Sequence, residues 1–145
     1  LVNQKHEAAR LRTTGGLTAL HLLCRQNPTE AELPAIDILL QADPSSLLQR
    51  DYSNQFTPLH LLCQGSRISL PVVKRLVDAN HTVAAIPDHD HYLPLHHASE
   101  IGGHVKLFLF YSNTILPLQK YLRENKIRLC HWHALATSLW KQCDC

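Results

Sequence analysis

A histidine and a cysteine recur three residues apart in this chain, a spacing at which two side chains meet on one helix face. LTALHLLC contains His21 and Cys24, and FTPLHLLC contains His60 and Cys63. A cysteine beside a histidine base can act as a nucleophile when a third group orients the base. A catalytic site, however, has no reason to be duplicated at a regular spacing. We therefore expect these residues to start and pack helices, and we expect no enzymatic activity.

The C-terminal tail offers metal chemistry, because imidazole and thiolate groups are zinc ligands. LCHWH at residues 129–133 is followed by CDC at residues 143–145. This pattern does not match a pair of C-x-x-C motifs, and the last two cysteines lie at the chain end, where disorder is common. We expect no cofactor. A zinc-dependent tail is the alternative, with the ligands Cys130, His133, Cys143 and Cys145 and with His131 beside them.

The stretch PDHDHYLPLHH at residues 87–97 contains four histidines and two aspartates. Its proline, aspartates and polar character are typical of a turn. We expect a solvated, histidine-rich turn that is able to capture metal adventitiously. The histidines are His89, His91, His96 and His97.

Two sequence elements repeat along the chain, and together they define a period. In the T-[AP]-L-H element, Leu59 follows Leu20 by 39 residues, and Leu95 follows Leu59 by 36 residues. The second element begins Leu-Pro and continues with apolar residues at helical spacing. It occurs as LPAIDILLQAD from Leu33, LPVVKRLVDAN from Leu70 and LPLQKYLREN from Leu116.

Both elements indicate helices. Thr18 and Thr57 are suited to the N-cap position, and an alanine or proline follows each of them. Pro34, Pro71 and Pro117 suit the first turn of the second helix. Apolar residues follow at the i, i+3, i+4 spacing of one buried face. Asp43-Pro44 and Asn80 are then expected to end these helices.

The order of these elements resembles an ankyrin-repeat protein, in which a T-P-L-H helix, an apolar second helix and an Asp-containing turn follow one another. The resemblance implies an all-α, ankyrin-type helix-turn-helix repeat solenoid with exposed turn fingers. It covers residues 13–125 as three repeats, approximately 13–50, 51–87 and 88–125, between an N-terminal flank (1–12) and a C-terminal capping or degenerate repeat segment (126–145). The motif positions are Thr18, Leu20, His21, Thr57, Leu59, His60, Leu95 and His96.

The chain departs from the family pattern in several places. The repeats exceed the ankyrin length of about 33 residues, and we expect the excess between the two helices, for instance at residues 25–32. The turn glycine of the pattern is present only as Gly16, with Gln55 and His91 at the matching places. Leu93 replaces the capping threonine. An additional apolar segment lies at residues 105–112. It either extends a helix or is itself the second helix of the third repeat, in which case the element from Leu116 begins another unit.

Ankyrin proteins bind other proteins through finger tips and the exposed side of the first helix, so the resemblance implies another protein as the partner. The corresponding finger residues are Tyr52, Ser53, Asn54, Gln55, His89, Asp90 and His91. Those on the first helices are Leu22, Arg25, Gln26, Leu61, Gln64, His97, Glu100 and Ile101. For Leu22 and Leu61, burial against an inserted loop is the alternative.

Composition sets further expectations. A formal net charge of +2 and 18% charged residues give no electrostatic reason to expect a nucleic-acid or membrane partner, and nothing indicates a small-molecule substrate. Cys24 and Cys63 lie in apolar repeats, which favours a reducing, intracellular setting, most simply the cytoplasm. The chain contains no methionine, so we expect a processed form or a segment of something longer. The alternative to a protein-interaction module is a regulatory or targeting segment of a larger multidomain protein.

Overall fold

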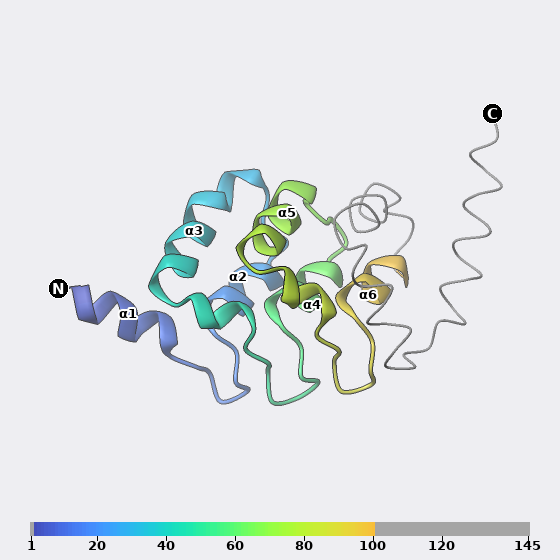
Figure 1. Cartoon of the computed structure of the whole chain (residues 1–145), viewed down its shortest axis with the longest axis horizontal. Coiled ribbons are helices and arrows are strands. Elements are labelled where there is room, and N and C mark those ends of the chain that lie inside the picture. The colour runs from blue at the N-terminus through green and yellow to red at the C-terminus, as the bar shows by residue number, and fades with distance from the viewer. Residues whose placement is uncertain (1, 101–145) are drawn as a thin grey trace.

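A computed structural model describes residues 2–100, and every regular element within them is helical, as the sequence predicts. The first row of helices comprises α2 (Ala19–Arg25), α4 (Pro58–Cys63) and α6 (Pro94–Glu100). The second row comprises α3 (Leu33–Ala42) and α5 (Leu70–Ala79). Helices α2, α4 and α6 pack side by side, α3 packs on α2, and α5 packs on α4 (Figure 1). The loops that precede α2, α4 and α6 project in one direction (Figure 1).

The first-row helices begin where the sequence predicts. Thr18 and Thr57 are N-cap residues with extended backbones, and each forms a capping box with the histidine three residues later. Pro58 occupies the first turn of α4, where its missing amide hydrogen costs nothing. Leu93 has no hydroxyl, yet its amide N–H donates to His96 Nδ1 at 2.8 Å before α6. The histidine half of the cap is therefore retained in the third repeat.

The second-row helices carry Pro34 and Pro71 in their first turns, as predicted, and they end before Asp43 and Asn80. Each is followed by a 3-10 helix that the sequence analysis did not foresee, η2 (Pro44–Leu47) and η3 (His81–Ala85). Asp43 Oδ1 accepts the amide N–H of Ser45, and Asn80 Oδ1 accepts that of Thr82. The residues that end each helix thus also cap the next turn.

One hydrophobic core runs between the two rows. It contains Leu20 of α2, Leu59 of α4 and Leu95 of α6 from the first row, and Ile36 and Leu76 from the second. Burying one such side chain contributes about 1.5–3 kcal/mol relative to leaving it exposed. Since the core is continuous from one helix pair to the next, each pair depends on its neighbours for the burial of its apolar face.

Two segments differ from the sequence expectation. Residues 1–12 were predicted only as a flank, but the structure places helix α1 (Val2–Arg10) there, in contact with α3. The insertion expected at residues 25–32 contains a short 3-10 helix, η1 (Glu30–Glu32), capped by Thr29. Its capping box stabilises the helical turn in this connection, because Glu32 Oε2 accepts the amide N–H of Thr29 at 2.7 Å.

The expectations for residues 101–145 lie outside the described residues. They include the apolar segment at 105–112, the element from Leu116 and the C-terminal segment 126–145. Among residues 2–100, none of the helices has the length and apolar character needed to cross a bilayer.

Candidate functional site

The three projecting loops end in finger turns, here called finger 1 (residues 13–17), finger 2 (51–56) and finger 3 (88–92). Each turn is closed by a backbone hydrogen bond between its first N–H and its last carbonyl oxygen. These bonds measure 3.0 Å in finger 1, 3.0 Å in finger 2 and 2.9 Å in finger 3. Finger 2 is one residue longer than the others, and its additional residue lies within the tip.

The first side chain of finger 2 and that of finger 3 support their turns from inside. Asp51 Oδ1 accepts the amides of Asn54 and Phe56, both at 3.0 Å. Asp88 Oδ1 accepts the amides of Asp90 and Tyr92, both at 2.9 Å. Both aspartates are buried, so the carboxylates are held by the turn and are not free surface charges.

The fingers are also joined to one another along the row. The amide N–H of Tyr52 donates to the Gly15 carbonyl at 2.9 Å, and the amide N–H of His89 donates to the Asn54 carbonyl at 2.9 Å. A Cβ atom on Gly16 would lie 2.8 Å from the Tyr52 ring, so this ring packs directly on the backbone of finger 1. The three tips therefore form one continuous edge.

A left-handed backbone recurs near the end of each finger. Gly16 has φ 80°, Gln55 has φ 57° and His91 has φ 65°. Glycine adopts this conformation without steric cost, whereas other residues incur about 1–2 kcal/mol. The alignment of Gln55 and His91 with the turn glycine, made from the sequence, thus corresponds to a shared conformation in the structure.

His21 and His60 connect each first-row helix to the next finger. His21 Nε2 lies 3.0 Å from the Phe56 carbonyl oxygen, and His60 Nε2 lies 3.2 Å from that of Tyr92. On the other side of each ring, Nδ1 accepts a backbone N–H at 3.2 Å, from Thr18 and Thr57 respectively. Since an amide can only donate, Nδ1 is unprotonated and Nε2 carries the hydrogen.

Burial keeps both rings neutral. Desolvation lowers the pKa of His21 below its ordinary value of 6.5, and it lowers the pKa of His60 to about 4. The carbonyl and the finger carboxylates act in the opposite direction in each case, but more weakly. These histidines are thus uncharged connectors between repeats at neutral pH.

The two cysteines of the repeats lie in the core. Cys24 and Cys63 are fully buried free thiols. Burial raises the pKa of Cys24 to about 12 and also raises that of Cys63 well above its ordinary value. Neither thiol forms the thiolate that a nucleophile requires near neutral pH.

The residues predicted at the finger tips are all exposed. Of the six residues predicted on the first helices whose side chains the structure describes, three are exposed, and Leu22 is half-buried. The exposed finger residues are Tyr52, Ser53, Asn54, Gln55, His89, Asp90 and His91. The exposed helix residues are Arg25, Gln26 and Gln64, near the C-terminal ends of α2 and α4.

Leu61 and His97, which the resemblance assigned to the partner-binding side of the first helices, are both partly buried. Leu61 is half-buried and packs against the core. The His97 side chain is only 14% exposed, because its Nε2 pairs with Asp88 Oδ2 at 2.7 Å. The Glu100 side chain and all of Ile101 lie outside the described residues, as does the tail ligand set with Cys130.

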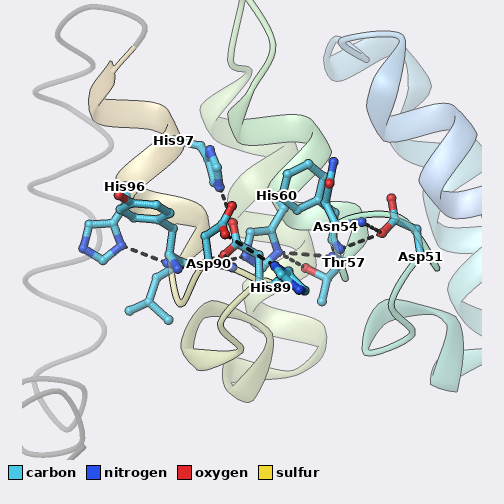
Figure 2. A network of polar contacts seen from close by, with 12 residues as sticks. Asp51, Asn54, Thr57, His60, His89, Asp90, His96 and His97 are labelled. Atoms are coloured by element: carbon cyan, nitrogen blue, oxygen red, sulfur yellow. Dashed lines mark hydrogen bonds and ion pairs between the residues drawn. The ribbon is translucent and has the colours of Figure 1, made fainter. Parts of the chain in front are cut away.

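A cluster formed by His60, Asp88 and His97 was not predicted from the sequence. One ligand atom from each lies within 4.8 Å of the others. Figure 2 shows His60 and His97 on neighbouring helices, both close to the turn that carries His89 and Asp90. Phe56 closes one side, with ring centroids 5.6 Å from His60 and 5.3 Å from His97. The available signal was a histidine at position 97, where the two preceding repeats have leucine.

No family model and no curated protein matches this chain.

Proposed function

We propose that this chain is an ankyrin-type solenoid that binds another protein through its fingers. The partner would contact the exposed tips of fingers 2 and 3 and the accessible ends of α2 and α4. The observation that supports this most directly is the hydrogen bond between His89 N–H and the Asn54 carbonyl. It fixes two exposed tips side by side, so the surface is ordered before any partner arrives, which reduces the entropic cost of binding.

The composition of the tips supports the same proposal. Tyr52 is 67% exposed although it is a large amphipathic side chain. Tyrosine is enriched among residues that dominate binding energy, because it buries a large area with few rotatable bonds. His89, Asp90 and His91 add polar groups beside it, on the next finger. A central aromatic residue with polar neighbours is the usual composition of a protein interface.

The proposal includes the absence of catalysis by the repeats. Its support is the duplication of the His-Cys pair, together with the burial and raised pKa values of Cys24 and Cys63. Each histidine already uses both ring nitrogens in contacts to Thr and carbonyl groups. Neither ring is free to act as a base toward the neighbouring thiol.

Quantitative affinity capture from the native cell tests the proposed surface. Tyr52→Ala removes the exposed aromatic side chain of finger 2, and His91→Gly removes an exposed side chain of finger 3 while keeping its backbone conformation. Ile38→Ala is the matched control, because Ile38 is 64% exposed but lies on α3 in the second row. We expect Tyr52→Ala to reduce capture of a specific partner at least about tenfold, the effect of one hot-spot residue.

Ile38→Ala is expected to leave capture unchanged. Circular dichroism of each variant establishes that the helices are retained. Equal capture by the wild type and both finger variants would disprove the proposed surface, and loss with Ile38→Ala alone would place the interface on the second row.

A further inference from the structure

His97 is the one member of the His60, Asp88 and His97 cluster that has no counterpart in the preceding repeats. The run Leu59-His60-Leu61 corresponds to Leu95-His96-His97. A polar side chain thus replaces a leucine that packs against the core. The finger does not need this change to form, since Asp51 supports finger 2 through two backbone amides alone, with Leu61 at the equivalent place.

The cluster brings together side chains from two repeats. His60 belongs to α4, Asp88 begins finger 3 and His97 belongs to α6. The Asp88 carboxylate is 2% exposed and its Oδ1 is occupied by the amides of Asp90 and Tyr92, which directs Oδ2 toward His97 Nε2 at 2.7 Å. His60 presents Nε2 to finger 3, where it contacts the Tyr92 carbonyl.

These ligands match one class of metal ion. Two imidazoles and a carboxylate suit zinc and similar transition metals, whereas magnesium and calcium prefer oxygen ligands alone. Ligands around a tetrahedral zinc are about 3.3 Å apart, given bonds of about 2.0–2.1 Å. The present atoms are within 4.8 Å of one another, so no pair has to approach by more than about 1.5 Å to reach that separation.

The surrounding residues support metal binding by holding the ligands in place. Asp88 is fixed by the two amides on Oδ1, and the stacked Phe56 ring shields the His60 side from water. When His60 Nε2 binds a metal, Nδ1 takes the hydrogen and donates to Thr57 Oγ1, which lies 2.8 Å away. This change breaks the hydrogen bond that the Thr57 amide N–H donates to His60 Nδ1. The Tyr92 carbonyl stays paired, because it also accepts the Asp88 amide at 2.9 Å.

We propose that His60, Asp88 and His97 form a zinc site that joins the second repeat to finger 3. The ion has three protein ligands, which leaves the fourth position of a tetrahedral zinc to water. The site fixes finger 3 against α4. It does not depend on the proposed partner binding, and it uses none of the cysteines of the tail.

The test uses the full chain, stripped of metal with a chelator and titrated with Zn²⁺ alone in competition with a chromogenic chelator. The key variant is His97→Leu, which restores the leucine of the preceding repeats and is expected to fold. Asp88→Asn removes the carboxylate ligand. Asp51→Asn is the matched control, because it makes the same change in finger 2, where Leu61 stands in place of the second histidine. Circular dichroism verifies the helices of each variant.

We expect the wild type to bind one zinc ion more than His97→Leu, or to bind that ion at least about tenfold more tightly, with Asp88→Asn similarly impaired and Asp51→Asn unaffected. Cobalt in place of zinc reports the ligand type, since thiolate ligands give an intense near-ultraviolet band and imidazole or carboxylate ligands do not. Zinc binding of equal number and affinity in the wild type, His97→Leu and Asp88→Asn would overturn the proposal. So would a cobalt spectrum with only a thiolate band that is unchanged by His97→Leu.

Discussion

His60 Nε2 lies 3.2 Å from the Tyr92 carbonyl oxygen, although the two residues are 32 positions apart in the sequence. The same ring is held at Nδ1 by the residue that starts its own helix, Thr57. One side chain therefore fixes a helix start and the finger of the next repeat together. His21 makes the equivalent contact with Phe56, so the arrangement repeats along the chain.

Replacing His60 by alanine is expected to destabilise the protein. The variant leaves a cavity at a fully buried position and removes the donor to the Tyr92 carbonyl. We expect the free energy of unfolding to fall by about 2–4 kcal/mol. Urea denaturation followed by circular dichroism measures this change. His89→Ala, at an exposed histidine, is the control and should change stability by no more than about 0.5 kcal/mol.

Acidification is expected to lower the stability through the same histidines. A histidine in the unfolded chain titrates near pH 6.5, whereas burial lowers the pKa of His60 in the fold to about 4. Between these values, unfolding takes up a proton. The contribution of His60 is therefore complete above about pH 6.5 and is lost as the pH falls toward about 4, at up to about 1.4 kcal/mol per pH unit.

Urea denaturation at a series of pH values checks this linkage. In a His60→Gln variant, the slope of the free energy of unfolding against pH should decrease by the equivalent of about one proton, because glutamine does not titrate. The exposed His89→Gln variant should retain the wild-type slope. An identical slope in wild type and His60→Gln would show that His60 titrates equally in the folded and unfolded chain.

Glycine at the left-handed finger positions is expected to stabilise the protein. Gln55 and His91 have positive φ, which is costly for a residue with a Cβ atom. Gln55→Gly and His91→Gly should each raise the free energy of unfolding by about 0.5–1 kcal/mol after the entropic cost of glycine. Gly16→Ala is the reciprocal change and should destabilise, since its Cβ would also lie 2.8 Å from the Tyr52 ring. Thermal unfolding distinguishes the two directions.

A further coupling is expected between Gly65 and Asn27, on the connections that follow α4 and α2. A Cβ atom on Gly65 would overlap Asn27 Oδ1, so Gly65→Ala must displace the asparagine and should destabilise the protein by about 1–3 kcal/mol. Asn27→Gly removes this obstacle. It also removes a buried oxygen that has no hydrogen-bond partner, and it places glycine at a residue whose backbone is left-handed, with φ 57°. A double-mutant cycle should therefore give a coupling of about 1 kcal/mol or more. Additive effects would show that the two residues do not interact.

The features that the sequence predicted well are those encoded by neighbouring residues. Thr57, Pro58 and His60 specify one helix start within four positions, and Pro71 specifies another, so local chemistry alone locates them. The missed features depend on contacts between distant elements. His97 turns inward because Asp88 lies on a finger nine residues earlier, and the orientation of neither side chain follows from local spacing. Helix α1 was missed because it lies in the flank outside the repeat motifs and packs on α3.

The repeat equivalence also predicts that a second metal site can be created. The equivalents of His60, Asp88 and His97 one repeat earlier are His21, Asp51 and Leu61. His21 already contacts Thr18 at the start of its helix, and Asp51 already accepts two amides of finger 2. Leu61→His supplies the missing ligand. We expect this variant to bind one zinc ion more than the wild type in the competition titration, with the increase abolished by adding Asp51→Asn. Leu61→Asn is the control for a polar residue of similar size without a ligating nitrogen. An unchanged zinc count in Leu61→His would show that the finger carboxylate and the connecting histidine do not by themselves position a site, and that the spacing in finger 3 is specific to it.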